Sequence, residues 1–289
     1  MTEGPVIPGL TGNLPLSHDI ADYPEGIVLA VDKPYRWTSA DVIRKLKYAA
    51  IKHFAKKNLK VGHAGTLDPL ATGVLLVCIG PACKRAQELQ DHDKEYIARI
   101  RFGATTPSYD LEKEVDRTFP YEHITEEAVR AALPAFLGEQ EQVAPLFSAK
   151  SVDGVRAYEL ARKLYRSGRI SELDAAALDT LQRNKINISE LELLEFVLER
   201  SGTESPRTLS ASPSSRIHVA ETAGMGLPEA VIRITCSKGT YIRAFARDLG
   251  EALGSGAHLG GLIRSRSGDY RIEDALSMED ALALFKGII

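Results

Sequence analysis

The sequence contains little cysteine. Its three cysteines are Cys78, Cys83 and Cys236, and no two of them form a Cys-x-x-Cys pair. Two of the three lie in or beside an apolar run. This pattern predicts buried free thiols in a reducing cytoplasm and argues against a zinc site.

Long apolar stretches are also missing, and none approaches the length of a membrane span. The first residues, MTEGPVIPGLTGNLPLSHD, contain no basic segment followed by an apolar one, so we expect no signal peptide. The chain has 289 residues, of which 44% are hydrophobic and 26% are charged, enough for a substantial core. We therefore predict a cytoplasmic globular protein with no membrane partner.

Acidic residues are absent from one long stretch, between Val42 and Leu67. Seven cations fall in it: Arg44, Lys45, Lys47, Lys52, Lys56, Lys57 and Lys60. The net charge is nevertheless −3, because acids gather around 110–142 and 171–204. A segregated basic stripe is typical of a surface that contacts phosphates, but also of a solvated helix face. Charge alone leaves both interpretations open.

The most informative segment is Gly62–Gly73, GHAGTLDPLATG, in which three glycines, a proline and two threonines surround Asp68. Glycine at this density marks backbone that bends sharply or lies close to a partner. An aspartate before proline is biased away from the helical region, which places Asp68 on a loop. The apolar run Val74–Ile79 predicts a buried element that anchors this loop. Asp68 is then either a candidate nucleophile or base, or part of a structural turn.

Hydrophobic periodicity predicts an α+β fold on a mixed sheet. Residues 1–25 have the composition of an extended arm, and 201–215 that of a Ser/Pro/Thr-rich insertion. We expect one domain over 26–289. The expected strands are 27–31, 94–102, 187–192, 217–221 and 230–236, and the expected helices are 41–56 (capped by Thr38 or Ser39), 125–136, 155–165, 240–253 and 277–285.

The run GHAGTLDPLATGVLLVCIG resembles the catalytic motif of the TruB family of tRNA pseudouridine synthases. In that family the aspartate at the position of Asp68 is the essential catalytic residue. The resemblance implies the pseudouridine synthase fold, with a mixed, largely antiparallel sheet flanked by helices and loops. It also implies that His63, Gly65, Thr66 and Leu67 contact RNA, with His63 helping to hold an extruded loop conformation.

Two shorter segments resemble the same family. Asp32-Lys33-Pro34 with Thr38-Ser39 matches its N-terminal motif, which implies that Lys33 packs beside the active-site loop. Lys94-Glu95-Tyr96 matches its K-x-Y element, whose tyrosine stacks on the target base. An aromatic ring can hold an extruded pyrimidine by its face, so the resemblance gives Tyr96 that role.

Three later segments complete the resemblance. The segment 142–150 matches with departures, since Ala144 replaces a proline and Phe147 a tyrosine, and it implies RNA binding by Lys150. The segment 236–250 implies that Arg243 is the salt-bridge partner of Asp68 and that Tyr241 is an active-site neighbour. The segment 258–268 implies that Leu262 lines the pocket. A paired arginine would keep the carboxylate ionised when an entering base excludes water from the site.

The resemblance therefore implies isomerisation of uridine at position 55 in the T loop of tRNA. This reaction has no redox change and no net hydrolysis, so we expect neither a cofactor nor a metal. The partner would be the T-arm stem-loop, bound by a monomer. About twenty residues follow Gly268, so we expect no C-terminal RNA-binding domain of the PUA type.

Three other functions stay open at this point. The first is a tRNA-folding chaperone, in which loop opening matters more than isomerisation. The second is the same chemistry on a guide-directed ribosomal RNA target, against which the missing PUA-type region argues. The third is a hydrolase built around Asp68. No second carboxylate has comparable support, which weighs against two-carboxylate glycosidase chemistry.

Overall fold

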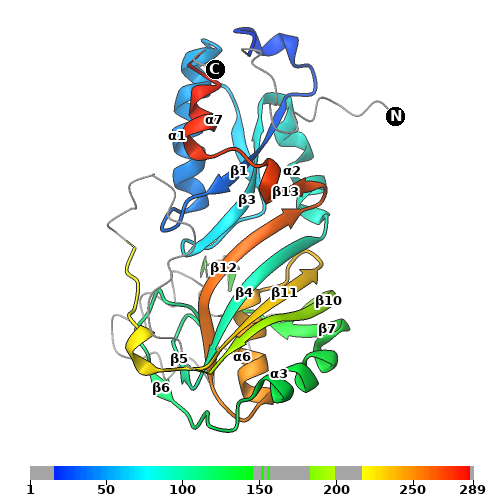
Figure 1. Cartoon of the computed structure of the whole chain (residues 1–289). Helices are drawn as coiled ribbons and strands as arrows, with labels where there is room; N and C mark the ends of the chain where they lie inside the picture. Colours follow the sequence, from blue (N-terminus) through cyan, green and yellow to red (C-terminus); the bar gives the residue numbers. More distant parts are fainter. Residues whose placement is uncertain (1–15, 146–150, 153–154, 157–182, 199–216, 287–289) are drawn as a thin grey trace. The chain divides into compact units, whose positions relative to one another are not determined.

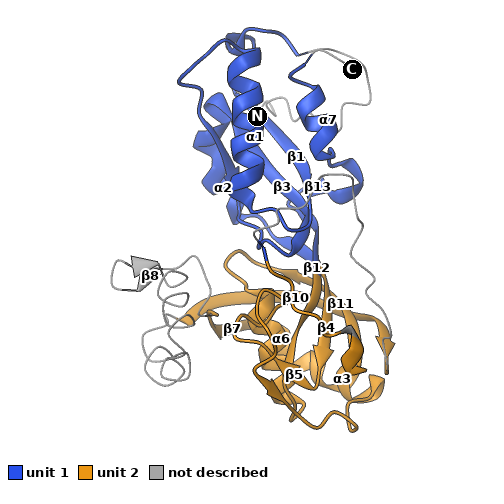
Figure 2. Cartoon of the chain, turned by 90° about the vertical axis from the view of Figure 1, so that its left-hand side faces the viewer, with its two compact units in different colours: residues 1–96, 205–217, 262–289 blue, residues 97–204, 218–261 orange. Residues whose placement is uncertain are grey.

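The computed structural model describes residues 16–145, 151–152, 155–156, 183–198 and 217–286 (Figure 1). The chain forms two compact units (Figure 2). Unit 1 comprises Met1–Tyr96, Ser205–Ile217 and Leu262–Ile289, and unit 2 comprises Ile97–Glu204 and His218–Gly261. Two strands, β4 (Lys94–Phe102) and β12 (Ala257–Ser267), contribute residues to both units.

The sheet is mixed and largely antiparallel, as predicted. Its main strands are hydrogen-bonded in the order β1-β3-β12-β4-β11-β10-β7. Strand β3 (Ala71–Ile79) pairs with β12 in parallel, whereas its pairs with β1 (Ile27–Lys33) and β2 (Val61–Ala64) are antiparallel. The predicted α+β fold class is therefore confirmed.

In unit 1, strand β3 forms the centre of the core. All nine of its residues are buried, which confirms the predicted anchoring element. Its register with β1 places Val31 opposite Leu75, and its register with β2 places His63 opposite Val77. The remaining elements of this unit are η1 (Ile20–Asp22), α1 (Ser39–His53), η2 (Gly80–Arg85), α2 (Ala86–Asp91), β13 (Tyr270–Arg271), η6 (Ile272–Asp274) and α7 (Met278–Ala283).

Helix α1 begins two residues before the predicted start and ends three residues before the predicted end, with one of the two predicted caps in place. Thr38 caps it, and the Asp41 side chain accepts from the Thr38 backbone in return, which completes a capping box. The helix buries a stripe that includes Val42 and Leu46. It ends at His53 rather than at residue 56, because Ala55 takes a left-handed conformation with φ of 49°.

In unit 2, strands β11 (Glu229–Cys236), β10 (Arg183–Val197) and β7 (Gly138–Val143) form an antiparallel set. Phe136 and Phe245 pack edge to face with ring centroids 5.3 Å apart. The other elements are β5 (Ala104–Thr105), β6 (Arg117–Thr118), α3 (Glu126–Ala132), η3 (Leu133–Phe136), β8 (Ser151–Val152), β9 (Val155–Arg156), η5 (Ala223–Met225) and α6 (Ile242–Ala252).

Two predicted elements are wrong. The strand expected at 217–221 does not form, and in this segment Ala220 donates a single backbone hydrogen bond to the Leu111 carbonyl. The helix expected from Val155 does not begin there, because Val155 and Arg156 form strand β9. The rest of that expected helix, the insertion 201–215, residues 1–15 and Lys150 lie outside the described residues. Among the helices that are described, none combines the length and the apolar character needed to span a bilayer.

Candidate active site

Asp68 lies on the loop between β2 and β3 in unit 1, as the sequence predicts, and it is partly buried. A buried hydroxyl holds the residue before it. Ser39 Oγ accepts from the Leu67 amide at 2.9 Å and donates to the Leu67 carbonyl at 3.0 Å. Both polar groups of Leu67 are thus satisfied inside the core, where an unpaired group costs about 1–3 kcal/mol. The loop is fixed at this point to the first residue of α1.

Lys33 holds the residue after the aspartate. Its ammonium group donates to the backbone carbonyls of Pro34, Trp37 and Pro69, at 3.1, 2.6 and 3.2 Å. Its side chain is fully buried, and this burial lowers the pKa of Lys33 to about 7. The nearby Asp68 carboxylate opposes that shift, since it favours the charged amine, and Arg264 adds to it.

Arg264 supports the start of the loop through hydrogen bonds. Its guanidinium donates to the Gly65 carbonyl at 3.1 Å and to the Val74 carbonyl at 2.7 Å, and only 1% of the residue is exposed. Gly73, with φ of 99°, brings its backbone against the same arginine, where a Cβ would lie 2.2 Å from the Arg264 carbonyl oxygen. The loop therefore has three buried supports, at Gly65, Leu67 and Pro69.

His63 precedes the loop on β2 and is partly buried. Burial lowers its pKa, and the charge of Arg264 lowers it further. Its Nδ1 atom is buried and has no hydrogen-bond partner among the described residues. Both effects favour the neutral imidazole. Thr66, by contrast, is exposed.

The other predicted residues of unit 1 lie on strands. Tyr96, on β4, is 9% exposed, and it follows the buried alternation that the sequence predicts for this strand. Leu262, on β12, is buried opposite Ala71 of β3. Ser265, also on β12, donates from its hydroxyl to the Glu95 carboxylate at 2.6 Å.

In unit 2, Arg243 lies near the start of α6 and is 5% exposed. Its Nε lies 3.8 Å from Oδ2 of Asp110, and its Nη1 donates to the Ser108 carbonyl at 3.2 Å. Asp110 is buried, and its Oδ1 accepts from Ser108 Oγ at 2.6 Å and from the Glu112 amide at 2.9 Å. A buried carboxylate thus orients the guanidinium. The pairing of Arg243 with Asp68 stays a prediction.

Tyr241 caps α6 and is held by Gln142 of β7. The Gln142 side chain accepts from the Tyr241 amide at 2.8 Å and donates to its carbonyl at 3.1 Å. This contact repeats in unit 2 what Ser39 does for Leu67 in unit 1: one side chain satisfies both backbone polar groups of one residue. The backbone that carries Tyr241 and Arg243 is therefore fixed.

Sequence reasoning missed the roles of Arg264 and Asp110. Arg264 falls in a segment that resembles the family, but nothing in its neighbours marks it as buried. Asp110 ends the run Pro107-Ser108-Tyr109-Asp110, a common turn composition with no distinctive signal. Within the described residues, no group of three or more His, Cys, Asp or Glu side chains could hold a metal ion.

The chemistry available in unit 1 is that of one carboxylate on a loop held at three points. Such support keeps a reactive group in place without reorganisation when a substrate enters. A chain of the solved structure described as "Crystal Structure of a Cbf5-Nop10-Gar1 Complex" has the same fold, with a TM-score of 0.57, 23% identity and coverage of 91% of this chain and 55% of that one. A related archaeal Nop10-Cbf5 complex gives a TM-score of 0.53 at 22% identity. The chain spans about half the length of these structural neighbours.

Sequence comparisons place the chain among the pseudouridine synthases. The sequence model described as "TruB family pseudouridylate synthase (N terminal domain)" matches residues 52–204. "tRNA pseudouridine synthase B" of Phocaeicola vulgatus is 51% identical over 89% of this chain and 92% of that protein. The protein of the same name from Deinococcus radiodurans is 38% identical over 88% of this chain and 77% of that protein. The chain belongs to the TruB family.

Proposed function

We propose that this protein converts uridine to pseudouridine at position 55 in the T loop of tRNA. The observation that carries the proposal is the Asp68 loop, fixed by Ser39, Lys33 and Arg264. The relatives named tRNA pseudouridine synthase B support tRNA as the substrate. These relatives are bacterial, and the proposed place of action is the cytoplasm.

The reaction breaks the bond between C1′ of the ribose and N1 of uracil. The freed uracil turns, a bond forms between C1′ and C5, the hydrogen on C5 is released as a proton, and N1 takes up a proton in its place. Substrate and product have the same composition, so the step needs no oxidant and no net water. The target base lies in a folded loop and must be flipped out before the reaction.

In this proposal Asp68 is the nucleophile or the initiating base, and Arg243 orients it. Tyr96 stacks on the uracil, while Leu262 lines the pocket. His63, which is only partly buried at the start of the loop, contacts the RNA. We assign further RNA contacts to Gly65, Thr66, Tyr241 and Lys150, in a monomeric enzyme whose catalytic domain covers 26–289. Lys33 and Leu67 are buried, and their role in this proposal is to hold the loop.

The position of the modification tests the substrate assignment. Whole tRNA transcripts carrying uridine or cytidine at position 55 are incubated with the protein, and pseudouridine is then mapped by reverse-transcription stops after carbodiimide treatment. The proposal predicts one stop, at position 55, in the uridine transcript only. Stops at another uridine, or the same stops in both transcripts, would show that position 55 in the T loop is not the target.

A further inference from the structure

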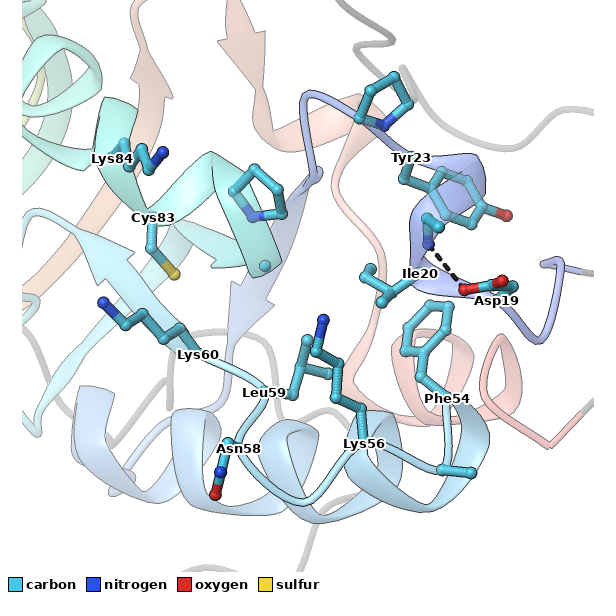
Figure 3. A pocket seen from close by; sticks show the side chains of 15 residues that line it. Asp19, Ile20, Tyr23, Phe54, Lys56, Asn58, Leu59, Lys60, Cys83 and Lys84 are labelled. Carbon is cyan, nitrogen blue, oxygen red and sulfur yellow. Dashed lines mark hydrogen bonds between the residues drawn. The ribbon is translucent and has the colours of Figure 1, made fainter.

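A groove of about 740 Å³ opens on unit 1 between η1, the turn after α1 and η2 (Figure 3). Its charged lining residues are three lysines, Lys56, Lys60 and Lys84, and one carboxylate, Asp19. We call it the lysine groove. The Asp19 carboxylate accepts from the Ala21 amide at 2.8 Å and so caps η1. All three lysines are exposed, and none forms an ion pair within the described part of the chain.

The lysine groove also has a fixed apolar wall. Ile20, Phe54 and Leu59 are buried residues that line it. The Tyr23 and Phe54 rings pack edge to face, with their centroids 6.1 Å apart. The Tyr23 hydroxyl accepts a hydrogen bond from the Ser17 amide at 2.9 Å. Figure 3 shows the labelled lysines and these rings around one hollow. Cations beside apolar and aromatic surface match the phosphates and sugar or base faces of a nucleic acid.

The groove is remote from the catalytic loop within the same unit. Asp68 precedes β3 and Gly80, a lining residue, follows it, and a strand of nine residues is about 30 Å long. Helix α1 covers much of the same distance, since its fifteen residues span about 22 Å. Its first residue, Ser39, binds Leu67, and its C-cap, Phe54, lines the groove.

Positively charged residues lie along the outer face of α1, between the Asp68 loop and the lysine groove. Lys47 and Lys52 are exposed on it, together with Tyr48, which is 76% exposed. Arg44 pairs with Asp41 at 2.7 Å, and Lys45 lies 4.7 Å from the centroid of the Trp37 ring. The basic stripe seen in the sequence therefore runs from the catalytic loop to the lysine groove.

We infer that the lysine groove binds the sugar-phosphate backbone of the substrate tRNA beyond the T arm, while the T loop occupies the Asp68 site. This inference rests on the proposed function for the identity of the RNA. The contact would add affinity and orientation without taking part in the reaction. Its removal should therefore weaken binding of whole tRNA and leave the reaction of a short T-arm hairpin intact.

The test compares two triple variants that remove the same charge. One is Lys56→Ala/Lys60→Ala/Lys84→Ala. The control is Arg130→Ala/Lys185→Ala/Arg271→Ala, which removes three exposed cations outside the groove and α1. Binding is measured by fluorescence anisotropy between 50 and 200 mM salt, and turnover by tritium release from C5-labelled uridine. The RNAs are whole tRNA and a T-arm hairpin with a five-base-pair stem, at most about 17 Å long.

For whole tRNA, the groove variant should raise Kd by about 10- to 100-fold, and the slope of log K against log salt should fall in magnitude by about 2 to 3. The control should stay within about twofold of wild type on the same RNA. On the hairpin, the groove variant should keep wild-type Kd and kcat, which also shows that its fold is intact.

Two results would overturn the inference. The first is that both triple variants bind whole tRNA with the same Kd. The second is that the groove variant loses the same factor in affinity for the hairpin as for whole tRNA. A wild-type protein that binds tRNA but releases no tritium would instead overturn the proposed function, and the binding comparison would still decide the groove.

Discussion

Ser39 binds both polar groups of Leu67, the residue immediately before the candidate catalytic aspartate, at 2.9 and 3.0 Å. Because Ser39 is also the first residue of α1, the position of Asp68 depends on where that helix begins. The capping box of Thr38 and Asp41 fixes that beginning. A local signal in the sequence therefore sets the geometry of a loop almost thirty residues away.

Removing the Ser39 hydroxyl should loosen the loop. We expect Ser39→Ala to lower kcat about tenfold and the free energy of unfolding by about 1–3 kcal/mol, because the buried Leu67 groups lose their partner. The matched control is Ser277→Ala, which removes the cap of α7 and should cost about 1 kcal/mol of stability. Steady-state tritium release and urea unfolding measure both effects. A kcat that falls equally in the two variants would show general destabilisation rather than loss of loop support.

Two glycines of the same motif should respond differently to alanine. At Gly73 a Cβ would clash with the Arg264 backbone at a φ of 99°, so Gly73→Ala should cost more than about 3 kcal/mol. At Gly62 nothing lies within 4 Å of the added Cβ, and Gly62→Ala should stay within about 0.5 kcal/mol of wild type. Thermal unfolding of the pair checks this. Similar melting temperatures for the two variants would contradict the close approach of Gly73 to Arg264.

The buried amine of Lys33 should make stability depend on pH. Its pKa is about 7 in the folded protein and close to 10.5 in the unfolded chain, so the unfolded state binds more protons between these values. Stability relative to Lys33→Met should therefore rise from pH 7 to pH 9, by at most about 1.4 kcal/mol per pH unit. Below pH 7 both states bind the proton and the difference should level off. Urea unfolding of both proteins at several pH values measures it, and a difference independent of pH would refute the lowered pKa.

Asp110 should matter through Arg243. We expect Asp110→Asn to lower kcat by about tenfold or more with a smaller change in KM, because the amide removes the charge that orients the guanidinium. Asp248→Asn on α6 is the control, since Asp248 pairs with Arg247 at 2.7 Å and is partly exposed. This control should retain near wild-type kcat. Loss of activity in both variants would point to damage to α6 instead.

Much of this architecture follows from local patterns in the sequence. The apolar run Val74–Ile79 is buried as β3, and the Asp-Pro pair lies on a loop. Thr38, Thr125 and Ser277 each cap the helix that the pattern predicts. These features depend on neighbours within a few residues, which is why the sequence alone predicts them.

The features that the sequence does not reveal depend on distant contacts. Arg264 is buried because two carbonyls some 190 residues earlier accept its hydrogen bonds. Residues 217–221 alternate like a strand, but among the described residues their backbone has no strand partner beyond the single bond to Leu111. Ala55 ends α1 by a left-handed turn although alanine favours helix. For Arg264, tertiary contacts override the local pattern.

The most direct test of the account is tritium release from a T-stem-loop RNA labelled at uridine C5, with wild type, Asp68→Asn and Asp269→Asn in parallel. Asp269 is exposed on unit 1 and serves as a matched carboxylate control. We expect release by wild type and Asp269→Asn and none by Asp68→Asn, which should still bind the RNA. Release by Asp68→Asn at the wild-type rate, or no release by wild type despite binding, would contradict the central claim that Asp68 carries the isomerisation.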